Sequence, residues 1–258
     1  MRIFETIAVA FAMFSALPVP QPVWSAKNMR YALCAFPLVG LACGAAWWGW
    51  LALCAMLHAP PLLQAVGLCV APVLITGGIH LDGYADTCDA LASCADAEKK
   101  QQILKDPHCG AFAVIRLITY FLAYFGLCTA FSGSRADLLC MGLAFVLERC
   151  LSGFAVAVFP LAKHTGLAHT FATAADQKTV RAVLGVLCVL LGIGLAAAGG
   201  LAGLAMAGAA GFALWRYQRV AKTQFGGVSG DLAGWFLQKA ELWMLAALVF
   251  CRLLEDVV

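Results

Sequence analysis

The chain alternates between long apolar segments and short polar connections. A helix that crosses a bilayer needs roughly 20 mostly apolar residues, and about seven segments come close to that length. The segments are Tyr31–Leu57, Leu62–Ile79, Gly110–Phe131, Leu138–Leu161, Val180–Ala198, Leu201–Trp215 and Leu232–Leu254. This pattern predicts an all-α polytopic membrane protein. Because no boundary separates the segments, residues 1–258 are expected to form a single integral membrane domain.

The N-terminal segment Ile3–Leu17 is apolar but short, and it stops at Pro18-Val19-Pro20. Proline cannot continue a helix beyond its first turn, and the segment is shorter than a span requires. A re-entrant or interfacial helix is therefore the alternative to a span here. A cleaved signal peptide is disfavoured because no convincing small-residue cleavage site follows.

Composition supports the membrane assignment. Apolar residues make up 63% of the chain and charged residues 12%, whereas soluble domains have about 45–50% and about 25%. The lipid bilayer is thus the expected surrounding, and the modest net charge of +3 predicts no nucleic-acid partner. A homo-oligomer is compatible with the pattern. The 12 Cys show neither zinc-ligand nor thioredoxin-like spacing, so we interpret them as packing residues.

The basic residues predict the orientation. If Leu62–Ile79 ends on the cytoplasmic side, the opposite side keeps only Arg135 and Arg252. This asymmetry agrees with the positive-inside rule and predicts a multi-pass protein of the cell inner membrane whose chemistry faces the cytoplasm. The residues that then share the cytoplasmic side are Lys27, Arg30, Lys99, Lys100, Lys105, Lys163, Lys178, Arg181, Arg216, Arg219 and Lys222.

An acidic run follows the second predicted span, within Gly77–Asp89. Asp82, Asp86 and Asp89 fall at positions i, i+4 and i+7, so a helix would line up the three carboxylates on one face. No Lys or Arg lies between His80 and Glu98 to neutralise that face. A divalent metal, and through it a phosphate-bearing ligand, is the leading candidate for the missing cation.

The loop that follows ends at Lys105-Asp106-Pro107-His108, directly before the next span. Asp106 is expected to be a fourth carboxylate of the metal site. Lys105 and His108 are suited to phosphate oxygens, Lys105 as a point charge and His108 as a hydrogen-bond donor. The alternative is a solvated loop with ordinary charges.

A second candidate lies before the last span, where Gly226, Gly227 and Gly230 precede Asp231. Backbone N–H groups of glycines at a helix start can hold an anion. The alternative is a flexible turn in which Asp231 caps the helix.

Charged residues also occur inside the predicted spans. Glu148 and Arg149 lie near the middle of one span, and Lys239 and Glu241 lie in the last. Intramembrane charges are costly and are by default functional or paired. A structural pair between Arg149 and Glu241 is the alternative to a functional role.

Taken together, these segments resemble the cobalamin synthase family, adenosylcobinamide-GDP ribazoletransferase. The resemblance runs nearly end to end, and its most specific part is the Gly-Gly-x-His-Leu-Asp-Gly-x-Ala-Asp-Thr-x-Asp string at 77–89. Further matching segments are Leu17-Pro18-Val19-Pro20, Phe36-Pro37-Leu38-Val39-Gly40, Lys105-Asp106, Gly110, Arg149, Gly166-Leu167, Gly226-Gly227, Asp231, Gly234 and Glu241.

The resemblance implies a Mg²⁺-dependent enzyme that joins adenosylcobinamide-GDP to α-ribazole or its 5′-phosphate and releases GMP. It implies catalytic and metal-binding roles for Asp82, Asp86, Asp89 and Asp106. It also implies substrate-binding roles for His80, Lys105, His108, Arg149, Gly226, Gly227, Gly230, Asp231 and Glu241. Two rivals remain. A CDP-alcohol-type phosphotransferase would have an Arg where Asp86 stands, and a transporter would carry charges in both membrane halves.

Overall fold

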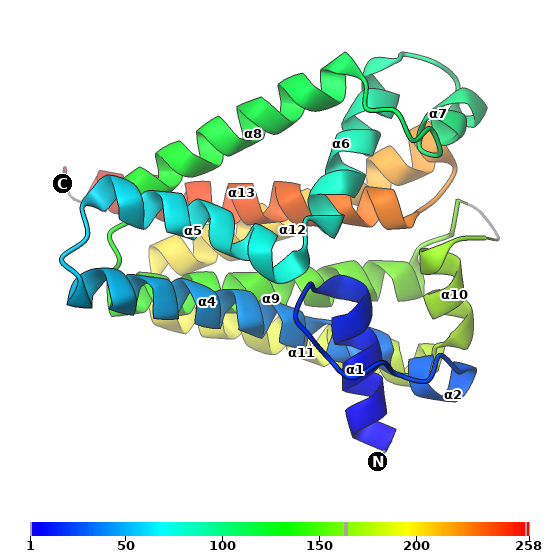
Figure 1. Ribbon diagram of the computed structural model, residues 1–258, viewed down its shortest axis with the longest axis horizontal. Coiled ribbons are helices and arrows are strands. Elements are labelled where there is room, and N and C mark those ends of the chain that lie inside the picture. The colour runs from blue at the N-terminus through cyan, green and yellow to red at the C-terminus, as the bar shows by residue number, and fades with distance from the viewer. Residues whose placement is uncertain (1, 163–164, 256, 258) are drawn as a thin grey trace.

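The computed structural model describes residues 2–162, 165–255 and 257, and nearly all of them form helices (Figure 1). The prediction of an all-α protein is confirmed, since the described residues contain no β-strand beyond an isolated bridge between Leu161 and Val228. The helices are α1 (Arg2–Phe14), α2 (Ala26–Met29), α3 (Ala32–Ala35), α4 (Pro37–Met56), α5 (Pro61–Thr76), α6 (Ile79–Ala92), α7 (Ala97–Ile103), α8 (Ala111–Thr129), α9 (Arg135–Val158), α10 (Leu167–Ala174), α11 (Gln177–Gly199), α12 (Leu201–Phe225) and α13 (Gly230–Glu255).

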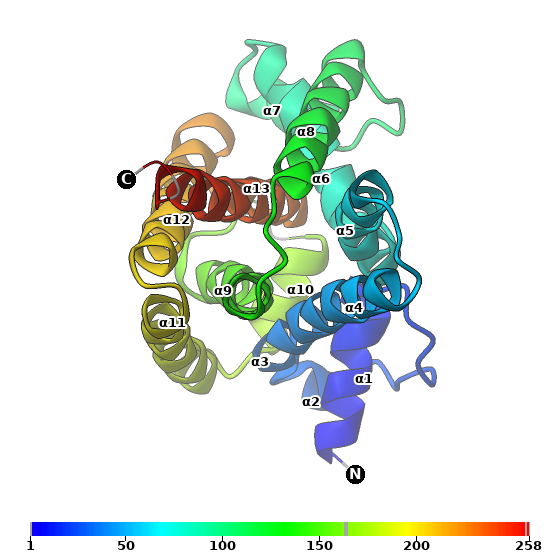
Figure 2. The same ribbon diagram turned by 90° about the vertical axis from the view of Figure 1, so that its left-hand side faces the viewer.

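Helix α9 lies at the centre of a bundle of long helices (Figure 2). Helices α4, α11 and α13 pack directly on it, and α12 lies between α11 and α13. Helices α5 and α8 form an outer layer beside α4 and α13. This arrangement explains why 67% of an apolar 18-residue stretch of α9 is buried inside the protein. The corresponding share is 22% in α8 and in α11, which expose much of their apolar surface.

Glycines allow α4 and α9 to approach each other closely. A side chain at Gly40 would overlap the backbone of Phe145, and a Cβ at Gly44 would come within 3.0 Å of the Gly142 Cα. Gly49, on the same helix, faces open space. Small residues at helix contacts are typical of membrane bundles, where close packing holds helices together because lipid tails are as apolar as the side chains.

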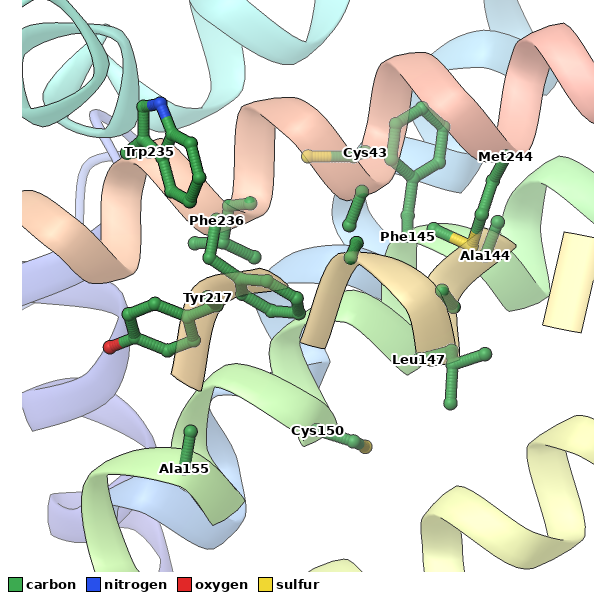
Figure 3. Packing of buried hydrophobic residues seen from close by; sticks show 14 of the residues in the cluster. Cys43, Ala144, Phe145, Leu147, Cys150, Ala155, Tyr217, Trp235, Phe236 and Met244 are labelled. Atoms are coloured by element: carbon green, nitrogen blue, oxygen red, sulfur yellow. The ribbon is translucent and has the colours of Figure 1, made fainter. Parts of the chain in front are cut away.

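Aromatic and small side chains fill the interior of the bundle (Figure 3). Tyr217 of α12 stacks on Phe236 of α13, with ring centroids 5.1 Å apart. Cys43 and Cys150 lie in the same cluster as buried free thiols. These positions agree with the interpretation of the Cys residues as packing residues.

Four helical segments in the described part of the chain are long and apolar enough to cross a membrane: Ala32–Met56, Ala111–Thr129, Arg135–Val158 and Gln177–Gly199. Helices α5 and α6 meet the criterion only as a pair. Helices α12 and α13 are long enough but more polar, because α12 carries Arg216, Arg219 and Lys222 and α13 carries Lys239 and Glu241. The expected number of spans is therefore approximate, while the polytopic helical architecture is confirmed.

The chain turns sharply between α5 and α6. Gly77 and Gly78 both adopt left-handed backbone angles, with φ of 65° and 79°, which only glycine adopts without strain. The two helices are bent by 95° relative to each other. The apolar segment expected to run to Ile79 thus ends at Thr76, and α6 crosses the end of the bundle (Figure 1).

Helix α1 also runs across the bundle (Figure 1). Its 13 residues cover about 20 Å at 1.5 Å per residue, which is less than the bilayer core of about 30 Å. The segment after it is attached to the end of α5, where the Ala16 N–H donates to the Ile75 carbonyl at 2.8 Å. Of the two expectations for this segment, the structure supports the short helix over a span.

Candidate functional site

The acidic run forms one face of α6, as its spacing predicts. Asp82 is exposed, and Asp86 and Asp89 are half-buried. The opposite face, which includes His80, Gly83 and Tyr84, is buried against neighbouring helices. The three carboxylates therefore point away from the bundle core at one end of the molecule.

Close packing of α6 on the start of α13 adds a fourth carboxylate. A Cβ at Gly83 would lie 2.8 Å from the Cα of Asp231, and a Cβ at Gly234 would lie 2.8 Å from the His80 carbonyl oxygen. Glycine at both positions lets the two helices touch backbone to backbone. Asp86 consequently experiences repulsion from Asp82, Asp231 and Asp89. We call Asp82, Asp86, Asp89 and Asp231 the acidic cluster.

Asp106, the carboxylate expected to complete the set, lies elsewhere. Its Oδ1 accepts from the His108 backbone N–H at 3.0 Å and lies 2.7 Å from the His108 Nδ1. These bonds hold the pKa of the Asp106 carboxyl below its ordinary value. Both side chains are more than half exposed. The structure therefore pairs Asp106 with His108, and their hydrogen bonds close a local turn.

Asp89 lies against the start of α8. A side chain at Gly110 would overlap the Asp89 carboxylate, so only glycine leaves room for this acid. Within the described residues, no group of three or more His, Cys, Asp or Glu side chains is arranged to hold a metal ion. The four-carboxylate metal site therefore stays a prediction.

Two adjoining cavities open beside Asp231. The first, the aromatic chamber, has a volume of about 280 Å³. Its walls are mainly apolar and include three phenylalanines, and the charged residues among them are Asp82 and Asp231. It is lined by Phe14, Leu33, Phe36, Ile79, His80, Asp82, Gly83, Ser152, Gly153, Val156, Leu167, Ala168, Phe171, Gly230, Asp231, Ala233, Gly234 and Leu237.

The second cavity, the polar chamber, has a volume of about 230 Å³. Lys105 contributes a cation, and Leu167, Ala168, Gly230 and Asp231 also line the aromatic chamber. The complete lining is Leu104, Lys105, Thr165, Gly166, Leu167, Ala168, His169, Val228, Ser229, Gly230 and Asp231. The two chambers therefore meet around Gly230 and Asp231.

The glycine loop before α13 is used mainly for structure. The Gly227 and Val228 N–H groups donate to the Ala221 and Pro160 carbonyls at 2.9 and 2.8 Å. A side chain at Gly227 would collide with the backbone of residues 160–162. Gly226 and Gly227 line neither chamber, whereas Gly230 lines both. The predicted anion cradle is thus reduced to Gly230 and the start of α13.

The alternative reading of this loop, in which Asp231 caps α13, also needs correction. The Leu232 N–H donates to the Ser229 Oγ at 3.3 Å, so Ser229 serves as the cap. Asp231 instead faces the chambers and the acidic cluster.

The charges inside the bundle form a buried group. The Arg149 Nη1 lies 2.6 Å from the Glu148 Oε1 and donates to the Phe145 carbonyl at 2.9 Å. Glu148, Arg149 and Glu241 are all buried. Arg149 therefore pairs with its sequence neighbour Glu148, and not with Glu241 as the structural alternative expected. Glu241 still acts electrostatically on both residues.

Neither Arg149 nor Glu241 lines the two chambers. Both line a separate cavity of about 10 Å³, next to Gln238. This is roughly the space that one water needs. Lys239 lies over the Tyr84 ring, 5.6 Å from its centroid, and is stabilised by that cation–π contact. The structure therefore gives these intramembrane charges partners within the protein.

Sequence reasoning missed the phenylalanines of the aromatic chamber. Phe14, Phe36 and Phe171 come from three distant segments, and apolar residues in a membrane protein carry no signal of their own. Phe36 and Gly166 did fall inside segments of the family resemblance. Their placement at the two chambers gives those matches a structural meaning.

Comparisons with known proteins identify the family of this chain. The sequence model of a family described as Cobalamin-5-phosphate synthase matches residues 6–249. Three similar curated proteins are each named adenosylcobinamide-GDP ribazoletransferase. The protein of Lachnoclostridium phytofermentans is 38% identical over 98% of this chain and 96% of its own length.

The other two are more distant. That of Desulfitobacterium hafniense (strain Y51) is 32% identical over 92% of this chain and 93% of its own length. The protein of Clostridium botulinum (strain Eklund 17B) is 30% identical over 93% of this chain and 95% of its own length. No solved structure matches the chain.

Proposed function

Because this chain belongs to the cobalamin-5-phosphate synthase family, we propose that it is a transferase that joins adenosylcobinamide-GDP to ribazole. The product is adenosylcobalamin, or its 5′-phosphate when the acceptor is ribazole 5′-phosphate, and GMP is released. This is the last step in assembling the nucleotide loop of cobalamin. Membership of this family favours the reaction over the phosphotransferase and transporter alternatives.

The reaction replaces the phosphoanhydride bond of the pyrophosphate with a new phosphate ester bond to the ribose. A ribose hydroxyl oxygen of ribazole attacks the phosphorus of the phosphate that is attached to cobinamide. An O–P bond forms, the bond from this phosphorus to the bridging oxygen breaks, and GMP leaves with that oxygen. The hydroxyl proton passes to a carboxylate. Asp82 and Asp231 are the candidates for that carboxylate, because both line the aromatic chamber and Asp231 also lines the polar chamber.

Positioning and charge neutralisation account for most of the catalysis in phosphoryl transfer. Lys105 is suited to the pyrophosphate because it is the cation of the polar chamber. His169 and the backbone of Gly230 line the same space. These groups would hold the phosphates. The ribose would lie beside Asp82.

The acidic cluster is suited to Mg²⁺. Four carboxylates gather on α6 and the start of α13, and repulsion acts on Asp86 from the other three. Mg²⁺ in phosphate-handling sites takes one or two protein carboxylates, with substrate phosphates and waters as its other ligands. Asp82 and Asp86 would hold the ion. When bound, it would neutralise negative charge on the phosphates.

One observation carries the proposal: Asp82 and Asp231 of the acidic cluster, together with Lys105, line two adjoining chambers. The test uses the purified protein in detergent with adenosylcobinamide-GDP, α-ribazole and Mg²⁺. We expect stoichiometric formation of GMP and the cobamide, loss of activity with EDTA, and recovery with excess Mg²⁺. Absence of GMP release by the folded protein would refute the assigned reaction. Turnover that persists in EDTA would refute the requirement for Mg²⁺.

We also propose that the site faces the cytoplasm from the inner membrane. Helices α2, α7 and α10 lie at one end of the bundle and the C-terminus at the other (Figure 1). The first end carries Lys27, Lys99 and Lys105, as the positive-inside rule requires of a cytoplasmic face. Lys163 of the same predicted group lies outside the described residues.

The exposed thiols test this orientation. Cys94 and Cys109 are exposed on the connections that flank α7. A membrane-impermeant thiol reagent is expected to label them in inside-out vesicles and to leave them unlabelled in intact spheroplasts. The Cys94→Ser/Cys109→Ser variant is the control for labelling at other thiols. Labelling of these two thiols in intact spheroplasts would reverse the orientation.

A further inference from the structure

The aromatic chamber is built from segments that are far apart in the sequence. Phe14 ends α1, Phe36 precedes α4, and Phe171 lies in α10. The Phe14 ring centroid is 4.3 Å from that of Phe36 and 5.5 Å from that of Phe171, and the rings are tilted against one another. His80 of α6 joins the group, 5.8 Å from Phe36. The chamber thus combines an aromatic wall with the acidic face of α6.

We propose that the aromatic chamber binds the base of ribazole, with the ribose directed towards Asp82 and Asp231. This inference rests on the proposed function and adds where the acceptor substrate binds. Ribazole is a ribonucleoside whose base is a dimethylated benzimidazole, which is flat, bicyclic and almost entirely apolar. A wall of phenylalanines matches such a base, because ring faces and edges attract each other at centroid distances of about 4.5–7 Å.

Size excludes the corrinoid as the occupant. The chamber measures about 280 Å³, which is near the lower limit of roughly 300 Å³ for pockets that bind drug-sized ligands. A corrin macrocycle with its side chains is several times larger. A bicyclic base with part of its ribose is of the appropriate size.

Polarity disfavours guanine. Guanine carries hydrogen-bonding groups along most of its edge, and those that faced the apolar wall would lose their bonds to water without gaining a partner. Away from Asp82 and Asp231, the polar side chains lining the chamber are only His80 and Ser152. Dimethylbenzimidazole presents a single free ring nitrogen. His80 lines the chamber, and among the described residues its buried Nε2 has no hydrogen-bond partner.

The carboxylates of the chamber then receive the sugar. Asp82, Gly230 and Asp231 line the aromatic chamber, and Gly230 and Asp231 also line the polar chamber. A ribose attached to a base against the phenylalanines would place its hydroxyls beside the two carboxylates and next to Lys105. The base subsite thereby orients the nucleophile towards the phosphates.

The inference gives α1 a role in specificity. Phe14 is the last residue of α1 and is half-buried in the chamber wall. Phe14→Leu removes the ring and keeps an apolar side chain of similar length, while Phe14→Tyr restores a ring. Phe4→Leu makes the same change on the same helix at a position that is 84% exposed and outside the chamber.

The test measures steady-state kinetics for both substrates. Loss of base–aromatic stacking is worth roughly 1–3 kcal/mol, so Phe14→Leu is expected to raise the KM for α-ribazole on the order of 10-fold. The KM for adenosylcobinamide-GDP should stay within about twofold. Phe14→Tyr should recover most of the loss and Phe4→Leu should behave as wild type. Thermal unfolding in detergent verifies that each variant is folded.

A second measurement uses inhibition of the wild-type enzyme as well as of the variant. Free 5,6-dimethylbenzimidazole is expected to inhibit competitively against α-ribazole and not against adenosylcobinamide-GDP, with weaker inhibition of Phe14→Leu. An unchanged KM for α-ribazole in folded Phe14→Leu, or a rise confined to adenosylcobinamide-GDP, would overturn the inference. These outcomes require an active wild type, so they are distinct from failure of the proposed function, in which wild type releases no GMP.

Discussion

Asp82→Asn is expected to reduce the rate of GMP release by about 10²–10³-fold, the usual effect of removing one group that stabilises charge in a transition state. Asp82 is the exposed acid of α6 and lines the aromatic chamber, so it lies where the ribose hydroxyl and the phosphates would meet. Asparagine has almost the same shape but neither accepts the proton nor neutralises a cation. The measurement is GMP formation by purified protein at saturating substrate across a Mg²⁺ titration.

The Mg²⁺ titration separates two roles of this carboxylate. If Asp82 is a metal ligand, the Mg²⁺ concentration for half-maximal activity should rise in Asp82→Asn and again in Asp82→Asn/Asp86→Asn. Glu98→Gln is the matched control, because Glu98 is exposed in the first turn of α7 and lines neither chamber. Wild-type turnover by Asp82→Asn would show that the reaction occurs elsewhere.

Arg149→Met is expected to lower the stability of the folded protein by about 3–5 kcal/mol, the usual cost of breaking a buried ion pair from one side. Glu148 and Arg149 are 0% and 1% exposed, so removal of the guanidinium leaves Glu148 in the bundle interior without its cation. Glu241 loses the same favourable charge. The change is read from thermal or denaturant unfolding in detergent.

The double variant Glu148→Met/Arg149→Met should be more stable than Arg149→Met. Removing both charges eliminates the unpaired acid, and apolar replacement of a buried pair is often nearly neutral. Leu139→Met, at a half-exposed position of the same helix, controls for the substitution and should stay within about 0.5 kcal/mol of wild type. At temperatures where the variants are folded, the KM values should be unchanged because Arg149 lines neither chamber. A double variant less stable than Arg149→Met, or a selective rise in KM, would contradict this structural role.

The pairing of Arg149 with Glu148 was not predictable from spacing. Adjacent residues on a helix point in different directions, so i,i+1 pairs are ordinarily not expected to meet. Here the long Arg149 side chain folds back to the Phe145 carbonyl one turn earlier and reaches Glu148 from there. The space around it is set by α4, α5 and α13, which the sequence does not position.

Asp106 shows the opposite error. Its place at the end of the acidic loop suggested a fourth metal ligand, but a carboxylate two residues before a histidine can close its own turn, and Asp106 does so with the His108 N–H. Asp231 takes its place beside Asp86, from a segment more than a hundred residues further along the chain. Local hydrogen bonding removed one acid from the site, and helix packing supplied another.

The sequence by itself determined the helical membrane architecture, the acidic face of α6 and membership of the family. These features depend on apolar length, on the 3.6-residue period and on an uncommon string of residues, all of which are local. Only the tertiary structure decided that Asp231 joins Asp82, that Lys105 lines the polar chamber and that Phe14, Phe36 and Phe171 form one wall. These contacts require the 95° bend at Gly77-Gly78 and the backbone contact at Gly83 and Gly234. Such contacts depend on how distant helices pack in space, which the period of a single helix does not encode.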